Sequence, residues 1–121
     1  MNILLADDDK LLSEIISDFL EMQKSNVKTA YDGQQGIDLC AKYEFDLAIV
    51  DIFMPVKDGL ELMSEIKNNY PHIKVIAISG MGREGSEAYK SALSCGARVV
   101  LEKPFNLSKL QQTIQDVTAP L

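Results

Sequence analysis

Five short apolar runs alternate along this chain with longer stretches whose apolar residues recur at helical spacing. Three of the runs are continuous rather than alternating, which is typical of strands buried on both faces of a parallel sheet. The expected strands are Asn2–Ala6, Val27–Ala30, Leu47–Val50, Val75–Ser79 and Val99–Glu102. Five βα units within 121 residues predict a single domain, residues 1–121, with a doubly wound α/β fold and right-handed crossovers.

Each expected strand is followed by a stretch with the apolar stripe of an amphipathic helix. The clearest stripe runs through residues 12–20, where apolar side chains stand at i, i+3, i+4, i+7 and i+8. The other four stripes fall within residues 37–41, 59–66, 88–95 and 107–117. Asp9 is placed to cap the first helix, and Asp58-Gly59 is placed to begin the third. We therefore expect Asp58 to have a structural role rather than a catalytic one.

The formal net charge of −6 argues against nucleic acid as a direct ligand, because such binding rests on neutralising phosphates with Lys and Arg. No stretch approaches the ~18 consecutive apolar residues of a membrane span. The N-terminal apolar run is also too short for a signal peptide. We therefore expect a cytoplasmic protein without a membrane segment. In that compartment its only two cysteines, Cys40 and Cys95, are expected to be reduced thiols.

Charged and polar residues stand where the expected strands end. Asp7 and Asp8 come directly after the first run, Asp51 follows the third, and Ser79 and Lys103 come at the ends of the fourth and fifth. Because the carboxyl ends of parallel strands share one edge of the sheet, these side chains are expected to meet in one crevice. Carboxylates at such range disfavour ionisation of at least one of them, so the empty site is expected to be strained. A cation or a chemical task is what such crowding requires, and this edge is the candidate functional site.

Four segments contain these residues: ILLADDDK, LAIVDIFMPVKDG, VIAISG and GARVVLEKPF. These segments and the spacing between them closely resemble the receiver domain of bacterial two-component response regulators, the CheY-like family. The resemblance extends from residue 2 to about residue 117. It implies a flavodoxin-like fold, with a five-stranded parallel sheet in the order 2-1-3-4-5 flanked by five helices. It also implies a signalling switch rather than an enzyme, one that catalyses only its own phosphorylation and slow dephosphorylation.

The resemblance assigns a role to each acid at the sheet edge. Asp51 is implied as the phosphoryl acceptor, and Asp7 and Asp8 as the pair that binds Mg²⁺, with Asp8 as the direct ligand and Asp7 acting mainly through water. Asp51 itself and the backbone carbonyl of Phe53 complete the implied ligands from the protein. Mg²⁺ suits such a set because it is a hard cation that takes oxygen ligands. It would also offset the repulsion between the acids and an incoming phosphate.

Ser79 and Lys103 are implied to contact the phosphoryl group through the hydroxyl and the ammonium. These groups would stabilise the charge that spreads over three phosphoryl oxygens during transfer. The bond between Lys103 and Pro104 is implied to be cis.

The resemblance also implies the partners. A histidine kinase or a histidine phosphotransfer protein donates the phosphoryl group. A downstream protein or output domain reads the face formed by the fourth helix, the fifth strand and the fifth helix. Because no output domain follows residue 121, we expect either a stand-alone regulator or the receiver part of a longer chain.

Several residues depart from the family's usual pattern. Val100 stands where an aromatic side chain often changes rotamer on activation, so the usual relay with Ser79 is not expected here. The loop 80–85 carries three glycines, which make conformational change easy, and we expect this loop to bear more of the switching. Phe53 and Met81 flank the acceptor with apolar side chains that cannot orient an attacking water. We therefore predict slow self-dephosphorylation.

Three alternatives are compatible with parts of this pattern, two of them from other classes of protein. A hydrolase that uses Asp51 as a turnover nucleophile would want a second acid two residues on, where this chain has Phe53. A flavodoxin-like cofactor binder shares the fold, but its phosphate loop would need Gly, Ser and Thr where this chain has three acids. A pseudo-receiver that binds partners without phosphorylation is disfavoured by the intact set of acids, Ser79 and Lys103.

Overall fold

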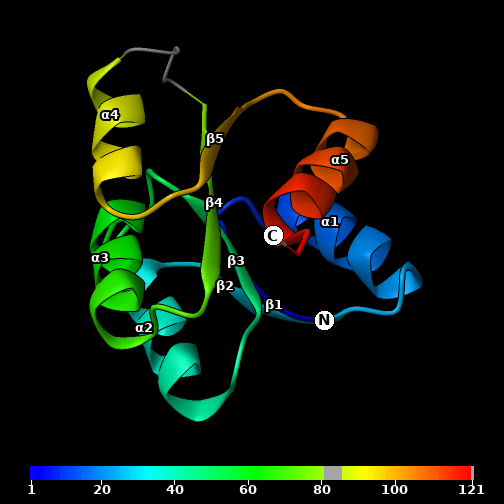
Figure 1. The fold of residues 1–121 in the computed structure, drawn as a ribbon, viewed down its shortest axis with the longest axis horizontal. Coiled ribbons are helices and arrows are strands. Elements are labelled where there is room, and N and C mark those ends of the chain that lie inside the picture. Colours follow the sequence, from blue (N-terminus) through cyan, green and yellow to red (C-terminus); the bar gives the residue numbers. More distant parts are fainter. Residues whose placement is uncertain (81–85, 121) are drawn as a thin grey trace.

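A five-stranded parallel sheet lies between two layers of helices in the computed structural model, which describes residues 1–80 and 86–120 (Figure 1). The strands are β1 (Asn2–Ala6), β2 (Asn26–Ala30), β3 (Leu47–Asp51), β4 (Lys74–Ser79) and β5 (Val99–Glu102). They pair in the order β2-β1-β3-β4-β5, and every pairing is parallel. The predicted fold class and strand order are confirmed, and each predicted strand lies within one residue of its observed bounds at either end.

Five helices connect and follow the strands. They are α1 (Lys10–Met22), α2 (Gly33–Lys42), α3 (Gly59–Asn69), α4 (Glu87–Ser94) and α5 (Leu107–Thr118). Each begins after a polar residue whose side chain accepts a hydrogen bond from a backbone N–H three residues on, as N-caps do. These caps are Asp9, Asp32, Asp58, Ser86 and Asn106. The structural role predicted for Asp9 and Asp58 is confirmed.

Side chains of the sheet alternate between two hydrophobic layers. Ile3 and Leu5 pack in the layer with α1 and α5, whereas Leu4 and Ala6 pack in the layer with α2, α3 and α4. The ribbon shows the same division, with α1 and α5 on one side of the sheet and the other helices on the opposite side (Figure 1). Each fully buried aliphatic side chain contributes roughly 1.5–3 kcal/mol to the free energy of unfolding. The central strands therefore give the residues at their ends a rigid base.

The register of the sheet aligns the ends of β1, β3, β4 and β5. Ala6 pairs with Val50, and the next pairing along β3 brings Asp51 opposite Ile78. Ser79 pairs in turn with Glu102 at the end of β5. The residues that follow these four strands consequently share one edge, as the sequence predicts.

Two further features bear on the sequence-based expectations. Both cysteines are free thiols, and burial, with a smaller contribution from the charge of Glu65, raises the pKa of Cys40 to about 11. Among the residues that the structure describes, no helix combines the length and the apolar character needed to cross a membrane. The loop residues 81–85, with Met81 and two of the glycines expected to take part in switching, lie outside the described residues.

Candidate functional site

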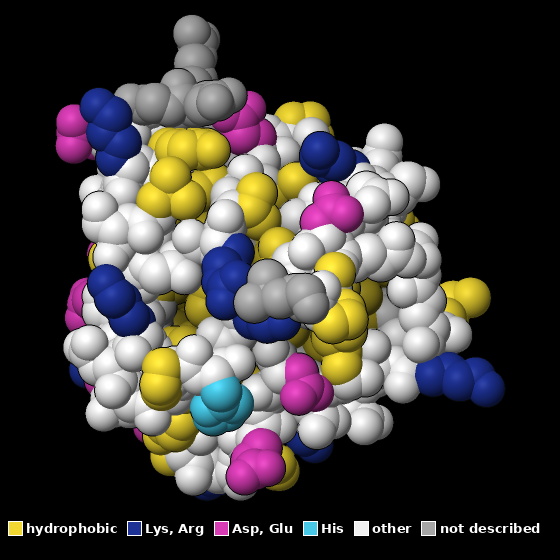
Figure 2. All heavy atoms as spheres, viewed as in Figure 1, with side chains coloured by type: hydrophobic (Ala, Val, Ile, Leu, Met, Phe, Trp, Pro, Cys, Tyr) yellow, Lys and Arg dark blue, Asp and Glu magenta, His cyan; other side chains and the backbone are white. Residues whose placement is uncertain are grey.

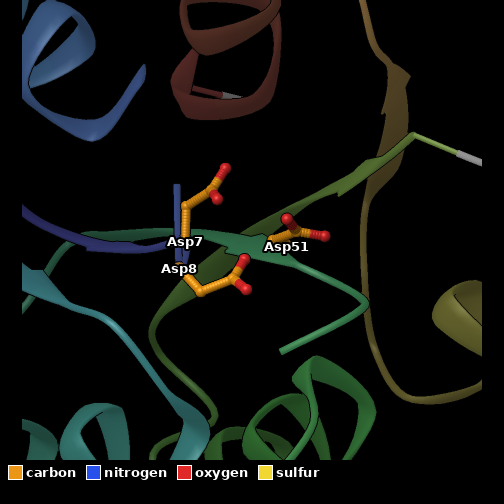
Figure 3. Close-up of side chains that lie close together, drawn as sticks. All are labelled: Asp7, Asp8 and Asp51. Atoms are coloured by element: carbon orange, nitrogen blue, oxygen red, sulfur yellow. The ribbon is translucent and has the colours of Figure 1, made fainter. Parts of the chain in front are cut away.

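Three carboxylates gather where β1 and β3 end. Asp7 directly follows β1, Asp8 lies in the turn after it, and Asp51 is the last residue of β3. Figure 3 shows the three side chains close together at the ends of these two strands. One carboxylate oxygen from each lies within 4.8 Å of the others. Asp7 is fully buried and Asp51 is 5% exposed, whereas Asp8 is exposed. The predicted cluster of acids at the carboxyl edge of the sheet is therefore present.

Asp7 is held by the backbone on several sides. Its N–H donates to the Ala30 carbonyl at 3.0 Å, and its Oδ1 accepts from the Asp9 N–H at 2.9 Å. Its carbonyl accepts a hydrogen bond from the hydroxyl of Ser13, a residue to which the sequence analysis gave no role. Its Oδ2 is buried and accepts no hydrogen bond, although the Lys103 ammonium lies 3.1 Å away. Asp7 Oδ2 thus forms an ion pair with Lys103 but accepts no hydrogen bond, so it can still accept one from a ligand.

Lys103 bridges two of the acids. Its Nζ lies 3.1 Å from Asp7 Oδ2 and 3.1 Å from Asp51 Oδ2, and it donates a hydrogen bond to the latter. Burial lowers the pKa of Lys103, but the hydrogen bond to Asp51, the close contact with Asp7 and the negative charges of both acids outweigh this effect, so the net shift is upward. The ammonium is thus retained in this site. The peptide bond between Lys103 and Pro104 is cis, as predicted.

The pKa of Asp51 is raised above its ordinary value. Burial is the largest cause, and the charge of Asp7 adds to it. The Phe53 N–H, which donates to Asp51 Oδ1 at 3.0 Å, and the Lys103 ammonium act in the opposite direction without cancelling these effects. Both partners of the Asp51–Lys103 pair thus have raised pKa values, since the lysine gains two negative neighbours while the aspartate loses solvent and faces another acid.

The remaining predicted residues lie beside these acids. Ser79 is the last residue of β4 and is 1% exposed, at the end of the strand next to β3. Phe53 is 48% exposed, in the loop between β3 and α3. That loop also contains Val56, which is 79% exposed and has a φ of 67°. A positive φ is unusual for a β-branched residue and was not foreseen from the sequence.

The donor set fits a hard divalent cation. Three carboxylates face one ammonium, all the donors are oxygens, and one buried oxygen of Asp7 lacks a hydrogen bond. An ion that takes carboxylate oxygens would offset the excess negative charge and give that oxygen a partner.

The fold and site together define a class: a doubly wound α/β domain with a cluster of acids and a bridging lysine at the carboxyl edge of its sheet. A family model for the response regulator receiver domain matches residues 3–115, and the chain belongs to this family.

Two curated relatives and one solved structure illustrate the similarity. The chemotaxis protein CheY of Halobacterium salinarum is 31% identical over 95% of this chain and 94% of its own length. The response regulator GtcR of Aneurinibacillus migulanus is 36% identical over 86% of this chain, which spans only 42% of that protein. The response regulator TrrA of Thermotoga maritima, solved in complex with Mg²⁺-BeF, is 25% identical, with a TM-score of 0.82 over 96% of this chain and 97% of its own.

Proposed function

We propose that this receiver domain is switched by transfer of a phosphoryl group to Asp51, donated by a histidine kinase or a histidine phosphotransfer protein. The observation that carries the assignment is the position of Asp51. It ends a fully buried strand, with an ammonium 3.1 Å from one of its oxygens and two further carboxylates within 4.8 Å of its ligand oxygen. Such signalling domains act as switches, and their chemistry is limited to gaining and losing the phosphoryl group.

The contacts of Asp51 suit a carboxylate nucleophile. An oxygen of Asp51 attacks phosphorus, the new O–P bond forms as the N–P bond of a phosphohistidine breaks, and the electron pair of that bond returns to the imidazole nitrogen. The Phe53 N–H orients the carboxylate through Oδ1. The Lys103 ammonium, already bonded to Oδ2, would stabilise the charge on the phosphoryl oxygens, and the Ser79 hydroxyl would contact the same group.

Mg²⁺ is the proposed cofactor. Asp8, Asp51 and the Phe53 carbonyl would be its direct ligands from the protein, and Asp7 would act mainly through water. When bound, the cation supplies positive charge that offsets the acids and the phosphoryl oxygens. The Mg²⁺-BeF complex of TrrA supports this choice, as does the buried Asp7 oxygen without a hydrogen bond.

The proposed output surface is the face formed by α4, β5 and α5. A hollow of about 520 Å³ lies on this face, lined on three sides by Tyr89 of α4, Val100 of β5 and Lys109 of α5. Figure 2, seen from the same side as Figure 1, shows hydrophobic side chains on this face between charged side chains of both signs. A downstream protein or output domain would bind here. Val100, which is buried with 8% of its surface exposed, is a small apolar residue at the position where the family often has an aromatic one.

We further propose a cytoplasmic location, with no direct binding of nucleic acid or membrane. The net charge of −6 supports the first exclusion, since phosphate backbones repel such a surface.

Phosphorylation by a small donor tests the assignment. With acetyl phosphate and Mg²⁺, intact-mass measurement should show one added phosphoryl group on the wild type and none on Asp51→Asn. Asp46→Asn is the matched control and should be labelled like the wild type, because Asp46 lies just before the opposite end of the same strand. Equal labelling of Asp51→Asn would refute the acceptor assignment.

A further inference from the structure

A serine interrupts the buried stripe of α1. The residues of this helix that are buried are Ser13, Ile16 and Leu20, and Ser13 is 0% exposed. The spacing i, i+3, i+7 is that of a core-facing stripe, in which an apolar residue is expected at each position. A hydroxyl placed there costs free energy unless it forms a hydrogen bond.

The hydrogen bond of this serine leaves the helix. Ser13 Oγ donates to the carbonyl of Asp7 at 3.2 Å, six residues earlier and beyond the start of α1. The hydroxyls of Thr113 and Thr118 instead donate to carbonyls four residues earlier within their own helix, which is the common local arrangement. The Ser13 hydroxyl therefore joins α1 to the end of β1. At 3.2 Å the bond is long for an O–H donor, so its individual strength is modest.

Together with other hydrogen bonds, this bond holds the turn that contains Asp7 and Asp8. The N–H of Asp7 is bound to Ala30, its Oδ1 accepts from the N–H of Asp9, and Ser13 holds its carbonyl. Asp9 is itself fixed as the N-cap of α1, where its side chain accepts from Leu12 N–H at 3.1 Å. Asp8 lies between these two anchored residues, and its carboxylate is exposed. The direction of that carboxylate consequently depends on the backbone on either side of it.

We propose that Ser13 is a positioning residue for the cation site: its hydroxyl fixes the Asp7 carbonyl and thereby aims the Asp7 and Asp8 carboxylates at the position shared with Asp51. This inference rests on the proposed binding of Mg²⁺ by these acids. Groups that orient metal ligands from behind typically change metal affinity by 10–100-fold when removed. Because Ser13 acts through the backbone and through a long bond, we expect an effect of about tenfold, at the lower end of this range.

The test compares Mg²⁺ affinity, measured by isothermal titration calorimetry without any phosphodonor, in the wild type, Ser13→Ala and Ser17→Ala. Ser17→Ala is the same substitution in the same helix, but its hydroxyl donates to Glu21, away from the acidic turn. All proteins are titrated at a temperature where melting curves show them folded. If Ser13→Ala does not fold, Ser13→Cys takes its place, because a thiol has similar size and is only a weak donor. Exchange of the Asp9 amide hydrogen in metal-free protein provides a second readout.

The expected result is about tenfold weaker Mg²⁺ binding and faster exchange of the Asp9 amide in Ser13→Ala, with Ser17→Ala matching the wild type. A lower melting temperature with unchanged Mg²⁺ affinity would overturn the inference, because Ser13 would then only stabilise the fold. In that case the proposed function would stand. Failure of the wild type to bind Mg²⁺ would overturn both the inference and the proposed metal site, so the two failures are distinguishable.

Discussion

Removing the charge of Asp51 is expected to stabilise the metal-free domain. In the wild type Asp51 is 5% exposed, and its carboxylate lies in one cluster with those of Asp7 and Asp8. Asp51→Asn keeps the size of the side chain and an oxygen that can accept from the Phe53 N–H. It removes the negative charge that burial and Asp7 both disfavour. If removing this charge raises the stability of the domain, the cluster of acids is kept for its chemical role although it destabilises the fold.

The magnitude follows from the distances in the site. At an effective dielectric constant of about 20, unit charges 4.8 Å apart repel by roughly 3.5 kcal/mol, and charges 3.1 Å apart attract by roughly 5 kcal/mol. Neutralising Asp51 removes two such repulsions and one attraction, to Lys103, which keeps its contact with Asp7. The balance of these charge interactions is roughly 2 kcal/mol, and solvent screening of the exposed Asp8 lowers it. Relief of the burial of ionised Asp51, the largest cause of its raised pKa, acts in the opposite direction, so we expect a net stabilisation of about 1–2 kcal/mol. For a domain of this size, the corresponding rise in melting temperature is roughly 4–8 °C.

The assay is a thermal melt of the wild type, Asp51→Asn and Asp46→Asn, each with chelator and with excess Mg²⁺. Asp46→Asn is the control, because its carboxylate accepts a hydrogen bond from Asn2 at the far end of the sheet and has no share in the acidic cluster. In chelator, Asp51→Asn should melt above the wild type and Asp46→Asn should not. Mg²⁺ should raise the melting temperature of the wild type through linkage and raise that of Asp51→Asn by less.

The same comparison has a defined pH dependence. Because the pKa of Asp51 is raised in the fold, the folded state binds this proton more tightly than the unfolded chain does. The unfavourable contribution of ionised Asp51 is therefore full above its folded pKa and fades as the pH falls through that value toward the ordinary 3.8. The difference in melting temperature between Asp51→Asn and the wild type in chelator should be largest near neutral pH and decrease in acid. If Asp51→Asn melts below the wild type in chelator and gains as much from Mg²⁺, the acids do not form a shared cation site.

Three other substitutions, with Gly80→Ala as a control, probe the surroundings of the acceptor. Phe53→Asn should speed the loss of the phosphoryl group after labelling, because an amide can orient water where the exposed phenyl ring cannot; an unchanged decay rate would contradict this. Val56→Asn should raise the free energy of unfolding in urea by about 1 kcal/mol, because asparagine tolerates the observed φ of 67° better than a β-branched residue does. Gly59→Ala should lower that free energy by about 2–3 kcal/mol, because the added Cβ would clash with the Asp51 carbonyl. Gly80→Ala should change it little, because the Cβ added there would make only ordinary contact with Lys103. A similar loss in the two glycine variants would refute the account given for Gly59.

The fold could be predicted from the sequence because its signals are redundant. The central runs are continuous apolar stretches, as expected for strands covered on both faces, and every residue of β3 is indeed buried. Capping residues then fix where each helix begins. The bounds of three strands differ from the prediction by one residue: β2 begins at Asn26, β3 ends at Asp51 and β4 begins at Lys74. Each added residue is polar, so the apolar pattern of the sequence does not mark it as part of the strand.

The clustering of Asp7, Asp8 and Asp51 at one edge of the sheet and the capping role of Asp9 could be predicted from the sequence. The burial of each acid could not: Asp7 and Asp8 look alike in the sequence, yet Asp7 is fully buried and Asp8 is exposed. Which of them turns inward depends on the register of β1 and on where α1 begins, both of which are tertiary properties. The contribution of Ser13 could have been suspected from a polar residue within the apolar stripe of α1, but its partner lies outside the helix.

Lys103 explains how the domain tolerates this cluster before any phosphoryl group arrives. Its ammonium lies at 3.1 Å from both Asp7 and Asp51, so it screens the two buried acids from each other. One positive charge cannot balance three negative ones, and Asp8, the exposed member, keeps the excess in contact with solvent. A phosphoryl group on Asp51 would draw the same ammonium toward its oxygens and weaken the contact with Asp7. The cation proposed for the site is then needed most in the phosphorylated state, since the lysine that screened Asp7 is engaged elsewhere.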